Sequence, residues 1–328
     1  MVMKRTAKDV ALRAGTSVSA VSRAFKPGSA LSDDKRKRIL EAATELGYAT
    51  PSGQVASRVN LGTIALVAGD LANPFYPTVL EALSQELFKR ERRLILHVAP
   101  AGRDVDAVMQ QVLDYKVDAA IITSATLSST LARTCTQRKL PVVLFNRAQP
   151  EAGISAVSCD NFAGGRAIGE RIVESGRRRI AFVGGLEDTS THIERWRGFS
   201  EALNHAGIPL FAQVSGAFDY GKAFQAVSDL LREGVKPETI FCCNDVMALA
   251  AIDAAKACGM QVPGDLAVIG FDDIPMAAWQ SYRLTTVRQR IRLMIKECIE
   301  LIDLIMSDPE HAGTTRLVPG YLIERDSG

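Results

Sequence analysis

The sequence lacks the features that mark many enzymes, metal proteins and secreted proteins. Its six cysteines include no C-x-x-C pair and its four histidines are dispersed, which argues against a disulfide framework and a zinc site. It contains no G-x-G-x-x-G or G-x-x-x-x-G-K-[ST] phosphate loop and no G-x-S-x-G elbow. We therefore expect no enzyme activity, no metal site and no cofactor.

Long apolar runs are also absent. The first ten residues carry charges in place of the apolar core of a signal peptide, and no segment approaches the roughly 20 apolar residues of a spanning helix. These observations predict a cytoplasmic protein with reduced thiols. Cys159, Cys242 and Cys243 lie in or beside apolar, strand-like runs, where we expect them to be buried as small hydrophobic residues.

The charge of the chain is unevenly distributed. Its 328 residues are 47% hydrophobic, which is enough for more than one packed domain. Residues 1–60 contain 11 Lys and Arg against 5 Asp and Glu, a net charge of +6, whereas the remainder carries −4. A basic N-terminal part on an acidic body suggests that the N-terminal part meets a polyanion, although charge alone would equally fit a solvated basic surface.

Three short helices are predicted at the N-terminus. The first follows Thr6, with Asp9 at the spacing of a capping box, and ends at Gly15. The second follows Ser17 and runs from about Val18 to Phe25, and the third covers "SDDKRKRILEAATELG". Two short helices joined by a glycine-containing turn describe a helix-turn-helix unit.

The second predicted helix has a narrow apolar stripe. Val18, Val21 and Phe25 recur at i, i+3 and i+7, and we expect them to pack on the first and third helices. Small or polar residues are left on or near the opposite side: Ser17, Ser19, Ala20, Ser22 and Arg23. The major groove of DNA, about 12 Å wide, admits such a helix. The alternative is a three-helix cap with a polar outer face.

From Thr63 onward, apolar strand-like runs alternate with helical runs. One series extends from "TIALVAGD" to "PVVLFN" and a second from "RIAFVGG" to "LAVIGFDD". Such alternation predicts an α/β body with doubly wound parallel sheets, and its repetition predicts two lobes. Ligands bind such sheets at the carboxyl ends of the strands.

Polar residues at these predicted strand ends form a candidate binding site. Arg195, Asn244 and Asp272 would bring a guanidinium, an amide and a carboxylate to one cleft. This combination suits a polyhydroxylated or carboxylated small molecule. For Asp245 and Asp273 we prefer a structural interpretation, as caps of the segments that they precede.

The stretches "TAKDVALRAGTSVSAVSRAF" and "SDDKRKRILEAATELGY" resemble the N-terminus of the LacI/GalR (lac-repressor) family of transcriptional regulators. The segments "DLANPFY", "VSCDNFAGGR", "RWRGF" and "LTTVRQ" extend the resemblance over essentially the whole chain. It implies an all-α helix-turn-helix domain and a two-lobed body like that of type I periplasmic binding proteins. It also implies a repressor that binds a palindromic operator as a dimer and takes a small effector, a sugar or sugar acid.

Carried over position by position, the resemblance assigns DNA contacts. Val18 and Ser19 would read bases, and Arg23 matches an arginine near the far end of the recognition helix. Four positions match residues that commonly touch phosphate: Thr6, Ser17, Ser22 and Tyr48. Lys26 stands where the family usually has asparagine, so it would add a phosphate contact or change how the helix end is held.

Residues 51–61 have the composition of a linker between a DNA-binding domain at 1–50 and a body at 62–328. In the resembling family this region forms a hinge helix that wedges a leucine into the minor groove. The segment "VASRV" places Val59 at that leucine and Ala56 beside the groove, although Val is a smaller wedge and Gly53 disfavours helix. A flexible tether is the competing interpretation.

By the same match, Arg195, Asn244 and Asp272 are effector contacts of the second lobe, and Phe218 or Tyr220 is the aromatic ring that faces the ligand. Three residues of the first lobe lie at the corresponding strand ends: Asp70, Phe75 and Asn146.

The resemblance also implies that the chain crosses between lobes. The first lobe would hold about 62–160 and 290–320, and the second about 161–289 and 321–328. No leucine heptad tail follows, so we expect a dimer and not a tetramer. Two other classes remain as alternatives: a periplasmic-type sugar-binding module, which predicts an export signal and no helix-turn-helix, and a sugar-processing enzyme.

Overall fold

A computed structural model describes residues 6–25, 29, 31–46, 48, 62–99, 105–115, 117–123, 128–149, 153–308 and 311–328. The chain divides into two compact units, residues 1–63 and 64–328, which we call the head and the body. None of the helices in the described ranges combines the length and the apolarity needed to span a membrane.

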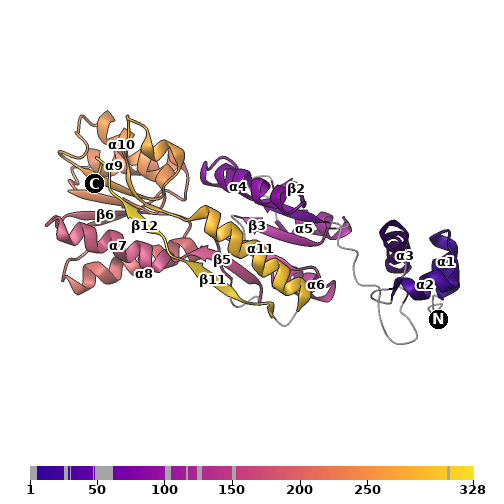
Figure 1. Cartoon of the computed structure of the whole chain (residues 1–328). Helices are drawn as coiled ribbons and strands as arrows, with labels where there is room; N and C mark the ends of the chain where they lie inside the picture. Colours follow the sequence, from indigo (N-terminus) through magenta and orange to yellow (C-terminus); the bar gives the residue numbers. More distant parts are fainter. Residues whose placement is uncertain are drawn as a thin grey trace. The chain divides into compact units, whose positions relative to one another are not determined.

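The head contains the three predicted helices, α1 (Ala7–Arg13), α2 (Val18–Ala24) and α3 (Asp33–Glu45) (Figure 1). Asp9 Oδ2 accepts hydrogen bonds from the backbone N and the Oγ1 of Thr6 at 2.8 and 2.9 Å, as the capping-box spacing predicts. Gly15 has a φ of 59°, the left-handed conformation that glycine adopts readily after a helix. Ser17 Oγ accepts from the backbone N of Ala20 at 3.3 Å and so caps α2.

The buried face of α2 differs from the predicted one. Ala20, Val21 and Ala24 are buried in the core of the head, whereas Val18 is 44% exposed. The expectation that Val18 packs inside and Ala20 faces outward was wrong, because the i, i+3, i+4, i+7 stripe starts at Ser17 and not one residue later. Two alanines on this stripe let α2 approach its neighbours closely.

The body contains two six-stranded sheets with helices around them (Figure 1). The first sheet has the strand order β11-β5-β4-β3-β1-β2, and we call it and its helices lobe 1. Its strands are β1 (Thr63–Ala68), β2 (Arg93–Val98), β3 (Ala119–Thr123), β4 (Val142–Phe145), β5 (Ser155–Cys159) and β11 (Thr315–Val318). Its helices are α4 (Phe75–Lys89), α5 (Val105–Asp114), α6 (Ser129–Gln137) and α11 (Ile291–Ser307).

The second sheet, with its helices, is lobe 2. Its strand order is β12-β10-β9-β8-β6-β7, in which β12 runs antiparallel to β10. Its strands are β6 (Ile180–Gly184), β7 (Ala212–Ser215), β8 (Thr239–Cys242), β9 (Ala267–Asp272), β10 (Thr285–Arg288) and β12 (Tyr321–Ile323). Its helices are α7 (Asn161–Glu174), α8 (Ser190–His205), α9 (Tyr220–Arg232) and α10 (Asp245–Ala257). The predicted fold class, a helix-turn-helix head and a doubly wound α/β body, is confirmed.

Strands buried on both faces explain the continuous apolar runs of the sequence. In β1, Ile64 and Leu66 belong to the same core as α4 and α11, while Ala65 and Val67 belong to the core under α5 and α6. All six residues of β1 are buried. A parallel strand covered by helices on both sides needs apolar residues at every position.

The chain passes from one sheet to the other after β5, after β10 and after β11. Each sheet therefore contains strands from distant parts of the sequence. Beside the first crossing, α7 and α8 lie side by side in lobe 2 (Figure 1). A Cβ on Gly165 of α7 would overlap the carbonyl oxygen of Arg195, and one on Gly198 of α8 would overlap that of Phe162. The two helices thus meet backbone to backbone, which fixes the position of Arg195.

We expect Gly198→Ala to lower the free energy of unfolding of the body by about 1–3 kcal/mol, because the added methyl group meets a backbone oxygen. Gly221→Ala is the matched control. A Cβ on Gly221, in the first turn of α9, would meet only Asp219 Oδ1, at 3.4 Å. Alanine there should leave stability unchanged or raise it by up to about 1 kcal/mol. Urea unfolding measures the stability of both variants. Equal stabilities of Gly198→Ala and Gly221→Ala would contradict the close packing of α7 on α8.

Candidate functional site

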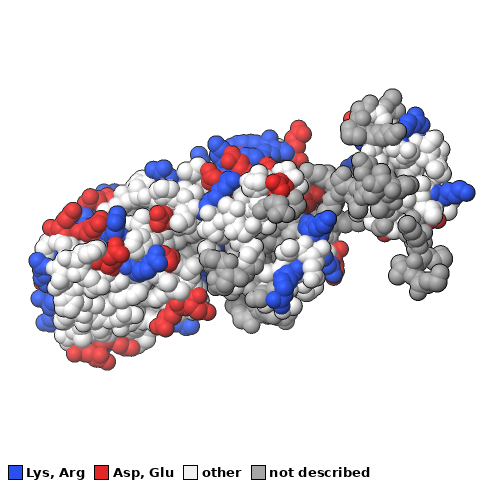
Figure 2. All heavy atoms as spheres, turned by 90° about the horizontal axis from the view of Figure 1, so that it is seen from below, with Lys and Arg blue, Asp and Glu red and all other residues white. Residues whose placement is uncertain are grey.

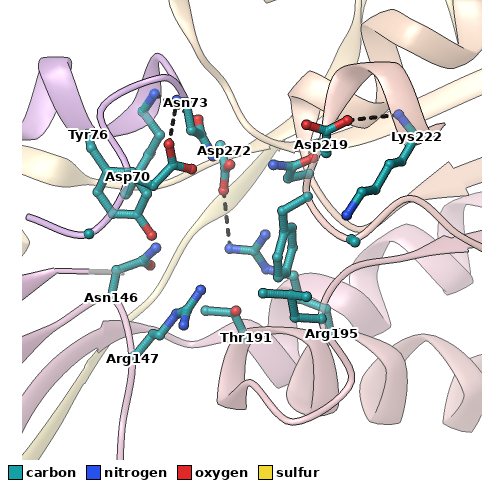
Figure 3. Close-up of a pocket in the computed structure, with 16 residues that line it drawn as sticks. Asp70, Asn73, Tyr76, Asn146, Arg147, Thr191, Arg195, Asp219, Lys222 and Asp272 are labelled. Carbon is teal, nitrogen blue, oxygen red and sulfur yellow. Dashed lines mark hydrogen bonds and ion pairs between the residues drawn. The ribbon is translucent and has the colours of Figure 1, made fainter. Parts of the chain in front are cut away.

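A cavity of about 450 Å³ opens at the carboxyl ends of strands from both sheets (Figure 3). Every residue predicted to contact an effector lines it: Asp70, Phe75, Asn146, Arg195, Phe218, Asn244 and Asp272. Of the two aromatic candidates, Phe218 lines the cavity, whereas the Tyr220 hydroxyl donates to Asp253 Oδ2 at 2.8 Å. The structure thus brings these residues together, and their contact with a ligand stays a prediction.

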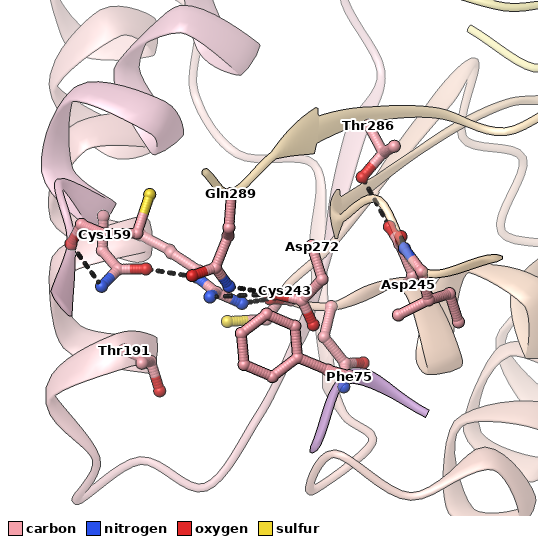
Figure 4. A network of polar contacts seen from close by, with 12 residues as sticks. Phe75, Cys159, Thr191, Cys243, Asp245, Asp272, Thr286 and Gln289 are labelled. Carbon is pink, nitrogen blue, oxygen red and sulfur yellow. Dashed lines mark hydrogen bonds and ion pairs between the residues drawn. The ribbon is translucent and has the colours of Figure 1, made fainter. Parts of the chain in front are cut away.

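Arg195 is the centre of a polar network in lobe 2. Asp272 and Gln289 of this network are labelled in Figure 4. The side chain of Arg195 is only 2% exposed. Nε donates to Asn161 Oδ1 at 2.8 Å, Nη1 donates to the Cys243 carbonyl at 2.6 Å, and Nη2 donates to Asp272 Oδ1 at 3.1 Å. The guanidinium carbon also lies 3.7 Å from the centroid of the Phe271 ring. These contacts hold Arg195 in place before any ligand arrives.

Two buried carboxylates belong to this region: Asp272 lines the cavity, and Asp245 lies behind its lining. Asp272 Oδ1 accepts from Gln289 Nε2 at 2.7 Å as well as from Arg195. Asp245 accepts from Thr286 Oγ1 at 2.6 Å and from the backbone N of Ile274 at 2.8 Å. Burial and the neighbouring charge of Asp272 raise the pKa of Asp245 to about 8. Because Asp272 has a guanidinium partner, the charge resides on Asp272 and Asp245 holds the proton.

Neither Asp245 nor Asp273 is a cap, contrary to expectation. The N-cap of α10 is Asn244, whose Oδ1 accepts the backbone N–H three residues later at 3.0 Å. Asp273 forms ion pairs with Arg288 and, at 2.6 Å, with Arg325. The prediction failed because α10 begins at Asp245 itself, so the capping position is one residue earlier, and because the C-terminal segment supplies an arginine to Asp273.

Three buried polar atoms of the cavity lining have no hydrogen-bond partner in the described part of the chain. They are Asn146 Oδ1, Arg147 Nε and Asn244 Nδ2. An unpaired buried donor or acceptor costs free energy, so native proteins rarely leave several in one place. Their concentration on one cavity points to a polar ligand that completes them.

Several lining residues have a backbone conformation that is unfavourable for side chains other than glycine. The φ angles are 68° at Asn146, 60° at Phe218 and 130° at Asp272. The Phe218 ring also lies on Gly185, where a Cβ would overlap it. Strain of this kind persists where the surroundings impose it and is frequent at binding sites.

Sequence reasoning missed other residues of the lining, among them Asn73, Tyr76, Arg147, Thr191 and Lys222. Thr191 could have been found, because it lies one helical turn before Arg195 on α8. Lys222 is in the first turn of α9, after Asp219, which caps that helix through a bond from the backbone N of Lys222 at 2.8 Å. The position of the Lys222 side chain depends on the conformation of the turn between β7 and α9. The hydrophobic pattern of the sequence does not predict that conformation.

The predicted DNA contacts of the head are mostly exposed. Thr6, Ser17, Val18, Ser19, Ser22 and Arg23 have exposed side chains. Tyr48 is buried, and its ring meets that of Phe25 edge-on, with 6.0 Å between centroids. Arg36 of α3, which sequence reasoning missed, donates to the carbonyls of Ala24 and Ser29 at 3.0 and 3.1 Å and holds the end of α2. Lys26, Ala56 and Val59 lie outside the described residues.

The thiols near the network are buried, as predicted for Cys159, Cys242 and Cys243. Burial raises the pKa of Cys159 to about 12 and that of Cys243 to about 11, so both thiols stay protonated near neutral pH. Within the described ranges, no group of three or more His, Cys, Asp or Glu side chains is arranged to hold a metal ion.

The raised pKa of Asp245 predicts that it makes the body less stable as pH rises. A carboxyl group with a folded-state pKa near 8, against 3.8 in the unfolded chain, contributes stability that is complete below pH 3.8 and is lost towards pH 8. Asp245→Asn should flatten this dependence, since an amide can accept from Ile274 and donate to Thr286. Thermal melts between about pH 5 and pH 8 measure the slope.

Asp326→Asn is the matched control, because the Asp326 carboxylate is exposed and pairs with Arg283 at 3.0 Å. It should keep the wild-type slope. A slope for Asp245→Asn that equals the wild-type slope would refute a protonated Asp245.

Comparison with known proteins adds independent findings. The family model for "Bacterial regulatory proteins, lacI family" matches residues 6–51, and that for "Periplasmic binding protein-like domain" matches residues 170–328. The chain is 31% identical to the HTH-type transcriptional repressor PurR of Erwinia tasmaniensis, over 98% of this chain and 96% of that protein. It is 30% identical to the HTH-type transcriptional repressor CytR of Escherichia coli K12, with the same coverage.

A solved structure of the transcriptional regulator CelR in complex with cellobiose superposes with a TM-score of 0.74 at 28% identity. The match covers 99% of this chain and all of the CelR chain. The full-length identity and the helix-turn-helix match lead to one conclusion: the chain belongs to the lacI family of bacterial regulatory proteins and is a DNA-binding transcriptional regulator, not an enzyme.

Proposed function

We propose that this protein is a repressor that binds an approximately palindromic operator as a homodimer, and that a small sugar or sugar derivative in the body cavity controls it. It would act in the cytoplasm, beside the DNA, without a cofactor or a metal ion. The observation that carries the proposal is a cavity with three unpartnered buried polar atoms, in a chain whose head exposes a helix of small and polar residues.

The exposed face of α2 supports base reading by the head. Val18, Ser19, Ser22 and Arg23 project from it, and their hydroxyl and guanidinium groups can bond base edges or phosphates. Arg23 Nε is 3.4 Å from the Ser19 carbonyl, a long bond that a nucleic acid could replace. Over the visible face of the body, by contrast, acidic and basic side chains lie next to one another (Figure 2). The excess of positive charge in the sequence lies in residues 1–60, with 11 Lys and Arg against 5 Asp and Glu, and DNA attracts such an excess.

The cavity supports a polyhydroxylated effector. Amides, carboxylates and the hydroxyls of Tyr76 and Thr191 surround it, and the Phe218 ring offers an apolar surface. Sugars combine such features, because their hydroxyls both donate and accept while their C–H faces lie on aromatic rings. The solved structure of the related regulator CelR is a complex with cellobiose, which is a sugar.

An exposed apolar edge of lobe 1 supports a homodimer. Strand β2 is an edge strand, and Ile95, Leu96 and Val98 on it are exposed. Phe88, in the last turn of α4, and Tyr115, directly after α5, are exposed as well. Open edge strands with apolar residues tend to pair or to be covered, and a second copy of the chain would cover this one.

Closure of the lobes on the effector would link the two sites. A ligand shifts such an equilibrium only if it binds one arrangement of the lobes more tightly than the other. A ligand that contacts both lobes meets this condition. The change in lobe orientation would alter the spacing of paired heads and hence their fit to two half-sites.

Selection from random duplexes should yield an approximate palindrome for the full chain. Ser19→Ala and Arg23→Ala should each weaken binding to that duplex by about 1–3 kcal/mol, because each removes a base or phosphate contact. Mobility shifts at fixed salt measure the loss. The control Arg232→Ala removes an exposed arginine of α9 and should bind as wild type. Wild-type affinity of both head variants would refute the assignment of α2.

Leu96→Asp should convert the dimer to a monomer, because it would bury an unpaired carboxylate in the interface. Sedimentation velocity measures the change. Leu317→Asp is the matched control, since Leu317 is 59% exposed on β11, the opposite edge strand of the same sheet. A dimeric Leu96→Asp chain, or a monomeric Leu317→Asp chain, would place the interface elsewhere.

A further inference from the structure

We infer that the effector is an anion, a sugar acid or a sugar phosphate, whose negative charge is held between Arg147 of lobe 1 and Lys222 of lobe 2. This inference rests on the proposed effector site and names the chemistry of its occupant. It follows from which charged side chains line the cavity and from which of them already have a partner within the protein.

The acidic groups of the lining already have partners. Asp272 is paired with Arg195 inside the wall. Asp70 Oδ1 accepts from the backbone N of Ala72 at 3.0 Å and from that of Asn73 at 3.2 Å. Asp219 accepts from a backbone N as the N-cap of α9. Each carboxylate is thus stabilised by donors of the chain, and Arg195 is neutralised by Asp272.

The two remaining cations have no such partner. In the described part of the chain, neither Arg147 nor Lys222 forms an ion pair, and Arg147 Nε is buried without any acceptor. Both side chains line the cavity, Arg147 from the segment after β4 and Lys222 from the first turn of α9 (Figure 3). Arg147 is half-buried, whereas Lys222 is exposed at the rim of the cavity. A half-buried cation without a counterion is unfavourable, so Arg147 favours a ligand with negative charge, which Lys222 can then reach from lobe 2.

The uncharged residues of the lining limit the kind of molecule that can carry the negative charge. Asn146 Oδ1 needs a donor and Asn244 Nδ2 needs an acceptor, and a hydroxyl group can serve either. The ring of Phe218 covers one side of the space. A bare inorganic ion would meet the charge but leave the amides and the ring unused. A polyol with one carboxylate or phosphate group satisfies all of them.

The position of the two cations also gives the charge a regulatory role. Arg147 and Lys222 belong to different lobes, so they repel one another when the lobes approach. An anion between them reverses the sign of this interaction and favours the closed body. A neutral sugar with the same carbon skeleton can make the hydroxyl contacts. Without the negative charge, however, it does not offset the repulsion between Arg147 and Lys222 and so favours the closed body less.

Calorimetric titration of the full chain tests the inference with a fixed set of probes. The carboxylates are gluconate and galacturonate, the phosphate is glucose 6-phosphate, and the neutral counterparts are glucose and galactose. We expect at least one anion to bind with a Kd below about 1 mM, and its neutral counterpart to bind at least about 10-fold more weakly. The carboxylate and phosphate arms identify which acid group fits.

Charge variants locate the contact. Arg147→Gln and Lys222→Gln should each raise the Kd of that anion by about 10- to 100-fold, since each removes a charge-assisted hydrogen bond. Lys222→Arg keeps the charge and should retain most of the affinity. The matched control Arg232→Gln removes a cation from the last turn of the same helix, where it is exposed, and should leave the Kd unchanged.

Three results would overturn the inference: a neutral sugar that binds as tightly as its acid, wild-type affinity of both Gln variants, or no anion of the set with a Kd below about 1 mM. Mobility shifts with the operator separate this outcome from failure of the proposed function. A neutral sugar that binds and alters operator affinity overturns only the inference. An anion that binds as expected without altering operator affinity overturns only the proposed control of DNA binding.

Discussion

A buried guanidinium, that of Arg195, is the constraint on which the cavity depends. Its partners come from the start of α7, the end of β8 and the end of β9, so three elements of lobe 2 meet on one side chain. Taking such a charge out of water is expensive, and here the Asp272 carboxylate and two oxygen acceptors offset the cost. Removing Arg195 would leave Asp272 buried without its counterion. Arg195 is thus an organiser of the wall as well as a predicted ligand contact.

Sequence patterns predicted most of the fold because the body obeys simple rules. Strands that are covered on both faces must be apolar throughout, and β1 and β3 show this in the residues from Ile64 to Val67 and from Ala119 to Ile122. Helix ends depend on capping side chains that the apolar periodicity does not reveal. Helix α8 starts at Ser190, because Thr189 Oγ1 accepts from the backbone N–H of His192 at 3.4 Å and caps the helix there.

Site residues at the ends of strands could be predicted from the sequence. Site residues whose position depends on the conformation of a loop could not. Asp272 was found because polar residues after buried strands gather at one edge of a sheet, and Asn146 because the family resemblance points to the corresponding strand end. The cap of α10 was placed one residue too late: Asn244, which lines the cavity as predicted, is also the N-cap, and Asp245 is a buried acid. In the head, the same error of one position put Val18 inside and Ala20 outside. A periodic pattern names the elements, but a shift of one residue rotates a helix by about 100° and changes which side chain is buried.

The three crossings between the sheets have a consequence for how the chain is made. The described core of the head uses residues 7–48 only, so it can close while the rest is still being synthesised. Neither sheet of the body is complete until β11 and β12, at residues 315–323, have left the ribosome. Domains generally fold as they emerge from the N-terminus. During translation the helix-turn-helix head can therefore fold well before the cavity of the body has formed.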